Sequence, residues 1–319
     1  MRFPELAGKT VLITGGTGFV GRSLVESFCT LDTGGHVVVL SRHPEQHESI
    51  EGVVEIVGDL RQVTHCDFVI HCATPSAREL AGDSSLFTET IELTRTALEF
   101  AAGSGSRRFL YASSGAVYGP QPSDLARVPE EFTGAPDSLD VQSAYAETKR
   151  AGELLCAAYN KRVGLETVVA RGFAFIGKYL PLGGKFAVGS FLFNALNGAP
   201  IEVTGDGTAI RSFLSAEEMA EWFWAILLRG APGRAYNVGS ETPVTIAELA
   251  LETAKLADPA VPVAILGTAD PARAAERYVP STARARRELG VTESVDWRIA
   301  LRTTYEWHRA RVAAEGHPS

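Results

Sequence analysis

Short apolar runs, rich in β-branched residues, alternate with longer amphipathic segments over the first half of the chain. The runs have the length and composition of strands, and the segment at residues 84–102 has apolar positions at helical spacing along one side. The runs lie at residues 10–14, 36–40, 53–57, 67–72 and 107–113. Strands that alternate with helices predict an α/β fold with a doubly wound parallel sheet.

The second half continues this pattern with fewer elements. We expect one helix from residue 145 to about 162, a sixth strand that ends near Arg171, and a core-facing helix at 217–228. A strand at 235–239 follows. This helix and strand are expected to return to the large sheet.

Composition and charge narrow the class of protein. Hydrophobic residues make up 45% of the 319 residues, which is ordinary for a soluble globule with a sizeable core. The formal net charge of −8 argues against nucleic acid or an anionic membrane as the main partner, because both require a basic surface.

The cysteine spacing, the lack of a leader before the first strand and the short length of the most apolar helix predict a cytoplasmic protein. Cys29, Cys66, Cys72 and Cys156 have no paired or metal-ligand spacing, so we expect free thiols and no metal site. The chain has no basic, apolar leader before its first strand, and its most apolar helical run, 222–228, is too short to cross a membrane.

A glycine-rich turn follows the first strand and precedes the first helix, at residues 19–31. Backbone N–H groups and the positive end of a helix converge at such a turn, and a pyrophosphate fits there. The glycines match the dinucleotide-binding fingerprint. The predicted contacts with a dinucleotide are Gly15, Gly16, Gly18, Phe19, Val20 and Gly21.

The ends of the next strands predict which dinucleotide binds. An NAD site usually has an acidic side chain after the second strand, but here the positions hold Ser41 and Arg42, which suit a 2′-phosphate. We therefore expect NADP, with NAD as the alternative. Further along the sheet edge, Asp59 and Leu60 are expected beside the adenine, and Cys72 and Ala73 beside the passing cofactor.

Candidate chemistry begins at Ser114, just after the fifth strand. A turn-rich segment at 120–136 leads to the helix that carries Tyr145 and Lys149, four residues apart and therefore on one face. A nearby ammonium and an oxidised nicotinamide ring favour the phenolate and lower the pKa of a tyrosine from about 10. Tyr145 can then exchange a proton with a sugar hydroxyl or carbonyl while hydride moves.

Together these motifs resemble the extended short-chain dehydrogenase/reductase family, in its nucleotide-sugar epimerase, dehydratase and reductase branch. The resemblance covers nearly the whole chain. It is carried by the glycine motif, the Ser-Ser-Gly-Ala-Val-Tyr-Gly motif at 113–119, Tyr145-x-x-x-Lys149, Gly205-Asp206-Gly207 followed by Arg211-Ser212-Phe213, and Tyr236-Asn237-Val238-Gly239-Ser240.

The resemblance implies roles for individual residues. Ser114 corresponds to the hydroxyl on the reacting sugar oxygen, Tyr145 to the acid/base, and Lys149 to the residue that holds the nicotinamide ribose. Arg211 resembles the arginine that grips the substrate diphosphate, with Arg273 or Arg277 as a second clamp.

The resemblance also predicts two domains and a homodimer. Residues 1–172 are expected to form the dinucleotide-binding Rossmann domain, with 209–239 returning to it. Residues 173–208 and 240–319 are expected to form a smaller α/β lobe that binds a nucleotide-diphosphate sugar. The dimer would form through the helices at 84–102 and 145–162.

Departures from the family pattern limit the reaction. Ala116, at a substrate-binding position, replaces the glutamate of 4,6-dehydratases and decarboxylases and the cysteine of 3,5-epimerases, and Gly115 replaces an acid of the dehydratases. Ala174 replaces a common asparagine beside Phe173, a predicted cofactor contact. Lys185 enters the substrate region, either as a phosphate or sugar contact or as a plain surface lysine.

Two reactions need only Ser114, Tyr145, Lys149 and a nicotinamide. The first is reduction of a keto group on a nucleotide-linked deoxyhexose by NADPH, which Ser41 and Arg42 favour. The second is epimerisation, most simply at C4, through a transient keto sugar. Dehydration is less expected, and a dinucleotide-binding regulator would typically lack the tyrosine or the lysine.

Overall fold

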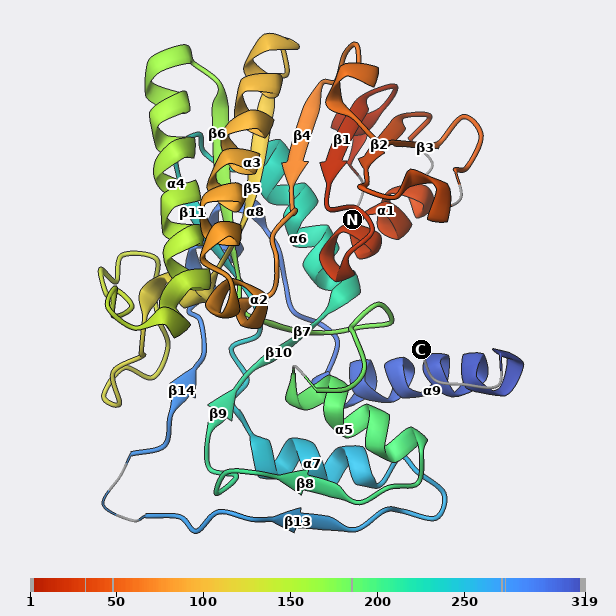
Figure 1. The fold of residues 1–319 in the computed structure, drawn as a ribbon, viewed down its shortest axis with the longest axis vertical. Helices are drawn as coiled ribbons and strands as arrows, with labels where there is room; N and C mark the ends of the chain where they lie inside the picture. The colour runs from red at the N-terminus through yellow and green to blue at the C-terminus, as the bar shows by residue number, and fades with distance from the viewer. Residues whose placement is uncertain are drawn as a thin grey trace.

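A seven-stranded parallel sheet forms the centre of the larger part of the molecule. The computed structural model describes residues 3–31, 33–47, 49–184, 186–270, 272 and 274–315. The strands are β1 (Thr10–Thr14), β2 (His36–Leu40), β3 (Val54–Val57), β4 (Phe68–His71), β5 (Arg108–Ser114), β6 (Glu166–Gly172) and β11 (Ala235–Val238). Their spatial order is β11-β6-β5-β4-β1-β2-β3, and every neighbouring pair is parallel (Figure 1).

Helices cover both faces of this sheet. On one face, Val11 and Ile13 of β1 pack into a core with α1 (Phe19–Thr30), α6 (Ala216–Arg229) and α8 (Ala283–Leu289). On the other, Leu12 packs into a core with α3 (Ser84–Gly103) and α4 (Ala144–Val163). Because successive strand residues enter opposite cores, the strands are apolar throughout, as a parallel sheet buried on both sides requires.

Smaller elements form a second layer below the carboxyl ends of the large sheet's strands (Figure 1). Its helices α5 (Ala187–Leu196), α7 (Ile246–Ala254) and α9 (Trp297–Glu315) contribute to a separate hydrophobic core. Its short strands pair as β8 (Ile201–Val203) with β13 (Val263–Ile265), as β7 (Ala174–Ile176) with β10 (Phe213–Ser215), and as β12 (Val244–Thr245), β9 (Ile210–Arg211) and β14 (Arg277–Tyr278) in one three-stranded sheet.

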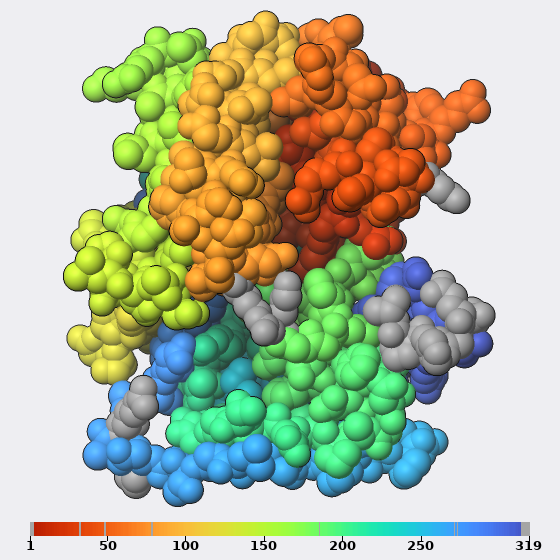
Figure 2. All heavy atoms as spheres, viewed as in Figure 1, coloured from red at the N-terminus to blue at the C-terminus, as the bar shows by residue number. Residues whose placement is uncertain are grey.

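The two layers meet at the long segment that joins β5 to α4. This segment begins with the 3-10 helix η4 (Gly115–Tyr118) and ends with another, η5 (Val141–Ser143). Val128, between them, forms a bridge with Pro280, two residues after β14. The contact is visible on the left of Figure 2, where the yellow and blue parts of the chain adjoin.

The fold class predicted from the sequence is confirmed. The predicted strands and helices agree with the structure to within one or two residues, and β11 lies at the edge of the large sheet beside β6. The sequence analysis did not identify α2 (Ala77–Gly82), a short helix that a Ser76–Glu79 capping box begins. All four cysteines are free thiols; Cys29 is exposed.

The described part of the chain contains neither a candidate membrane-spanning helix nor a candidate metal site. None of its helices is long and apolar enough to cross a membrane. In the same residues, no group of three or more His, Cys, Asp or Glu side chains is arranged to hold a metal ion.

Candidate active site

The glycine turn packs directly against the end of β4. Gly15 has a φ of +69°, and a Cβ there would lie 2.7 Å from the backbone nitrogen of Ala73. A Cβ at Gly21, in the first turn of α1, would lie 2.3 Å from the carbonyl oxygen of Gly15. Only glycine fits these two positions, so the backbone closes tightly beneath the N-terminus of α1. A dinucleotide pyrophosphate fits this arrangement, because it needs close backbone approach and a helix N-terminus.

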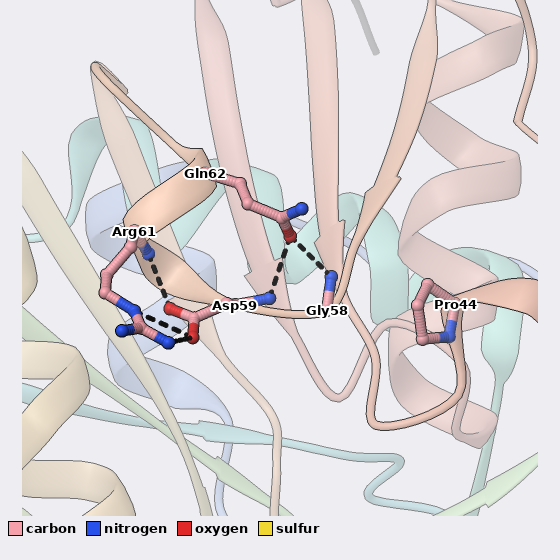
Figure 3. A pocket seen from close by; sticks show the side chains of 5 residues that line it. All are labelled: Pro44, Gly58, Asp59, Arg61 and Gln62. Carbon is pink, nitrogen blue, oxygen red and sulfur yellow. Dashed lines mark hydrogen bonds and ion pairs between the residues drawn. The ribbon is translucent and has the colours of Figure 1, made fainter.

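The adenosine end of the predicted site lies beside a shallow groove of about 550 Å³ that follows β3 (Figure 3). Asp59 accepts hydrogen bonds from the backbone N and the Nε of Arg61, at 2.8 and 2.9 Å. These bonds lower the pKa of Asp59 to about 2. Gln62 accepts from the backbone nitrogens of Gly58 and Asp59, and Pro44 lies on the far side of Gly58.

Ser41 and Arg42 differ in exposure at the end of β2. Ser41 is buried, and its hydroxyl accepts a hydrogen bond from the backbone nitrogen of His43 at 3.1 Å. Arg42 is exposed. Of the two residues, Arg42 is therefore the one able to reach a 2′-phosphate. Arg61 and Gln62 were missed from the sequence, although their position directly after Asp59 and Leu60 would have indicated them.

Ser114 and Tyr145 meet at the carboxyl end of β5. Ser114 is the last residue of this strand, and its hydroxyl accepts from the backbone nitrogen of Ala116 at 3.2 Å. Tyr145 lies in the first turn of α4, close enough to Ser114 for the serine hydroxyl to lower the pKa of its phenol. The half-buried phenol thus reaches the hydroxyl that the sequence analysis assigned to the reacting oxygen.

Lys149 ties α4 to the large sheet. Its ammonium donates to the carbonyl oxygen of Ala112 at 2.6 Å and to Oγ1 of Thr74 at 2.8 Å. It lies 5.7 Å from the ring centroid of Tyr145. Burial lowers the pKa of Lys149 to about 8, while the nearby Cys72 and Glu153 oppose that shift.

The pKa of Tyr145 shifts in the direction opposite to the sequence-based expectation. Burial raises it, and the hydrogen bond with Ser114 lowers it again in part. The Lys149 ammonium is directed at Ala112 and Thr74, so it is not placed to lower this pKa by direct contact. The predicted lowering therefore depends on the second charge in the argument, the oxidised nicotinamide ring.

Tyr278 is a site residue that sequence reasoning missed. It comes from β14 in the smaller layer, and its hydroxyl lies 3.5 Å from Oγ of Ser114. Its ring packs on Phe173, with 4.5 Å between the centroids. A two-residue strand after a turn-rich segment has no periodic pattern, and the sequence analysis named only the neighbouring Arg277, as a candidate diphosphate clamp. Arg277 is half-buried on the same strand.

Arg211 lies next to Tyr278, because these two residues are partners in the parallel pairing of β9 with β14. Its guanidinium donates to Glu276 at 2.7 Å and to the carbonyl oxygen of Ile210. Glu276 is largely exposed, so a substrate phosphate can compete with it for this arginine. The predicted contacts Lys185 and Arg273 lie outside the described residues.

A buried polar network supports the site from below. Glu153, one turn after Lys149, forms a bidentate ion pair with Arg171 of β6 and accepts from the hydroxyl of Ser113. Arg171 also donates to the hydroxyl of Tyr118 at 2.9 Å. Tyr118 in turn donates to the side chain of Asn237 in β11 at 2.8 Å. The network joins α4 to three strand ends of the large sheet.

Comparisons with known proteins agree with this geometry. A model of the NAD dependent epimerase/dehydratase family matches residues 11–239. A trifunctional UDP-glucose 4,6-dehydratase/UDP-4-keto-6-deoxy-D-glucose 3,5-epimerase/UDP-4-keto-L-rhamnose-reductase of Arabidopsis thaliana is 26% identical, over 94% of this chain and 47% of that protein. The chain thus spans about half the length of this relative. A dTDP-glucose 4,6-dehydratase of Streptomyces niveus is 27% identical, over 94% of this chain and 92% of that protein.

Solved structures show the same fold. The epimerase Mth375 of Methanothermobacter thermautotrophicus superposes with a TM-score of 0.83 at 26% identity, over 98% of this chain and 95% of that one. The enzyme WbmF of Bordetella bronchiseptica, solved in complex with NADH, has a TM-score of 0.81 at 25% identity, with the same coverage of both chains.

We predict that replacement of the buried lysine, Lys149→Met, changes how stability depends on pH. The pKa of about 8 in the folded chain lies below the ordinary 10.5, so charging this lysine opposes folding below pH 8. That cost disappears as the pH rises from 8 toward 10.5. The wild-type free energy of unfolding, minus that of the variant, should therefore rise across this window by up to about 3 kcal/mol. Urea unfolding at several pH values measures the difference; a constant difference contradicts the shift.

Proposed function

Because this chain belongs to the NAD dependent epimerase/dehydratase family, we propose that it reduces the keto group of a nucleoside-diphosphate keto-deoxyhexose with hydride from NADPH. The observation that carries the proposal is the placement of Tyr145 beside Ser114 at the carboxyl end of β5, one helical turn from Lys149. These are the groups that a carbonyl reduction beside a nicotinamide requires, and they lie at the edge of the sheet where the glycine turn lies.

In the proposed reaction the chain supplies the proton and orients the substrate carbonyl. NADPH, when bound, supplies the hydride. The Tyr145 phenol donates its proton to the carbonyl oxygen, so that oxygen becomes a hydroxyl and Tyr145 a phenolate, which solvent then reprotonates. Ser114 donates a hydrogen bond to the same oxygen and holds the carbonyl in place. Lys149 holds the nicotinamide ribose.

The surroundings of Ser114 argue against water elimination. The acid of the dehydratases is absent at position 115, where a Cβ would lie 2.7 Å from the hydroxyl of Tyr278 and from the ring of Phe173. Position 116 is alanine. The site therefore lacks the acidic groups beside Ser114 on which dehydration and decarboxylation depend in the relatives.

Epimerisation, most simply at C4, is the second candidate. It needs the same three residues, and the likeness to a solved structure named as an epimerase favours it. In this reaction Tyr145 first removes a proton from the sugar hydroxyl and later returns one. The nicotinamide is regenerated in each cycle, which separates this reaction from net reduction.

A nucleotide sugar is the proposed substrate, held by Arg211. Arg211 is the strand partner of Tyr278, and within the described residues its guanidinium is paired with an exposed carboxylate and a backbone carbonyl. A diphosphate can accept from such a planar donor at two oxygens. Solved relatives named as complexes with UDP or UDP-glucuronic acid support this substrate class.

NADP is the proposed dinucleotide, with NAD as the alternative. The end of β2 carries no acidic side chain for a ribose 2′-hydroxyl, and the exposed Arg42 provides a charge for a 2′-phosphate. The solved relative WbmF is named as a complex with NADH, so this chain would differ from it at the adenosine end.

A homodimer is the proposed assembly, formed by α3 and α4. Leu154 on α4 is 72% exposed, and Leu93 on α3 is also exposed. The exposed Val141 in η5 and Leu139 just before it add to the apolar surface that precedes α4. Apolar side chains exposed on adjacent helices are typical of a protein interface.

The proposed reaction predicts the outcome of Tyr145→Phe. The variant should lose turnover by about 10²–10⁴-fold, because it lacks the proton donor, while its affinity for NADPH stays within about twofold. Tyr159→Phe, on the same helix, is the matched control and should remain active. An unchanged turnover rate in Tyr145→Phe would overturn the role.

The fate of NADPH distinguishes the two candidate reactions. Net reduction predicts that one NADPH, followed by its absorbance, is consumed for each sugar converted. Conversion of the sugar without loss of NADPH absorbance indicates epimerisation instead.

The cofactor proposal predicts that Arg42→Ala weakens NADPH binding by about tenfold or more and leaves NADH binding unchanged, because only the 2′-phosphate loses a charged partner. Fluorescence titration gives both dissociation constants. Arg107→Ala, an exposed arginine just before β5, is the control. Tighter binding of NADH than NADPH by the wild-type protein would reject the preference.

The assembly proposal predicts that Leu154→Lys converts the dimer to a monomer, because a buried unpaired charge opposes association. Light scattering measures the mass. Ile299→Lys, at a residue on α9 that is 60% exposed, should remain dimeric. A monomeric wild-type protein would contradict the proposal.

A further inference from the structure

Three groups lie around the Ser114 hydroxyl: one backbone N–H and two phenols. Its oxygen accepts from the backbone nitrogen of Ala116 at 3.2 Å, and Tyr145 lies close enough for the serine to lower the pKa of its phenol. The hydroxyl of Tyr278 lies 3.5 Å away, at the long end for a hydrogen bond. Two phenols from opposite layers of the molecule therefore lie next to one serine hydroxyl.

A serine hydroxyl has one proton and two lone pairs, which limits how it can serve these partners. The Ala116 N–H takes one lone pair. One proton and one lone pair remain, so Ser114 can donate to one further group and accept from one. In the proposed reaction Tyr145 becomes a phenolate, which can only accept. The Ser114 proton then points to Tyr145, and the remaining lone pair faces Tyr278.

The surroundings of the two phenols suit this direction. Burial raises the pKa of Tyr278 above its ordinary value, so this phenol keeps its proton and acts as a donor. The charged and titratable groups that face Tyr278 are Tyr145, Arg211 and Tyr118. Those that face Tyr145 are Lys149, Tyr111 and Tyr278.

The segment that carries Tyr278 is held on both sides. The backbone nitrogen of Val279 donates to the side chain of Gln121 at 2.9 Å. The carbonyl oxygen of Ser281 accepts from the side chain of Asn237 at 3.0 Å. The position of the phenol over Ser114 is therefore a built feature of the contact between the layers.

Gly115 is the second observation that points to this phenol. A Cβ at position 115 would lie 2.7 Å from the Tyr278 hydroxyl. The same Cβ would lie 2.7 Å from the ring of Phe173, on which Tyr278 packs, so a larger residue would crowd both side chains. The glycine next to the reacting serine thus makes room for Tyr278.

We propose that Tyr278 is a positioning residue, whose O–H donates to Ser114 and so directs the Ser114 proton toward Tyr145 and the oxygen that Tyr145 protonates. This inference rests on the proposed function, because it takes Tyr145 as the group that changes protonation. Tyr278 itself exchanges no proton in the reaction.

The test uses the NADP-bound protein and the variant Tyr278→Phe, which keeps the ring against Phe173 and removes only the hydroxyl. Ser114 then loses the donor that fixes its direction, and the Tyr145 phenolate loses part of its stabilisation. The midpoint at which the phenolate appears should rise by about one pH unit, or about tenfold in the equilibrium. Ultraviolet difference absorbance measures it, with Tyr145→Phe subtracted to isolate Tyr145.

Turnover gives a second readout with a defined sign. Reduction needs protonated Tyr145, so a higher midpoint moves the basic limb of the kcat profile to higher pH by the same amount. NADPH affinity should stay within about twofold. Tyr236→Phe removes a hydroxyl that accepts from the backbone nitrogen of Ala231 and donates to Glu288. Neither bond involves Ser114, so this variant should shift neither readout.

A second variant guards against a trivial loss of structure. Gly115→Ala keeps Tyr278 but places a Cβ where its hydroxyl lies, so it should produce the same upward shift. The proposal is overturned if folded Tyr278→Phe and Gly115→Ala both leave the phenolate midpoint unchanged. That result would not touch the proposed function, which fails only if Tyr145→Phe retains turnover.

Discussion

The parallel pairing of the central strands is the constraint on which the site depends. Because β1, β4, β5 and β6 all run in one direction, their carboxyl ends meet at a single edge. The glycine turn, Ala73, Ser114 and Phe173 follow four of these ends and therefore lie close together, although they are distant in sequence. Lys149 then fixes α4 to the same edge through the carbonyl oxygen of Ala112 in β5.

The ion pair between Glu153 and Arg171 extends this constraint beyond the sheet. Both side chains are 16% exposed, and a pair this buried is stable only when its remaining donors and acceptors are satisfied. Ser113 and Tyr118 satisfy them, and Asn237 continues the network to the carbonyl oxygens of Val128 and Ser281. Helix α4 and the segments that approach Ser114 from the smaller layer are thereby held in one polar framework.

The sequence predicted the large sheet well because most positions of its strands are apolar, and because strands such as β1 and β5 lead directly into recognisable motifs. It also predicted which residues gather at the sheet edge. Tyr278 escaped notice because its place depends on tertiary pairing with Arg211 in a two-residue strand, which leaves no local pattern. The spacing did not give the position of the Lys149 ammonium for a related reason: four-residue spacing puts Lys149 and Tyr145 on one helix face, but the hydrogen-bond partners of the ammonium, Ala112 and Thr74, come from elsewhere in the chain.

The contact between Tyr278 and Ser114 has a consequence for the order in which the protein becomes complete on the ribosome. The glycine turn and the β4 end beneath it are finished once Ala73 has been made, whereas Tyr278 follows about 200 residues later. At the usual rates of translation this interval is about 10–40 s. A nascent chain can therefore complete the glycine turn well before it contains the tyrosine whose hydroxyl lies next to Ser114.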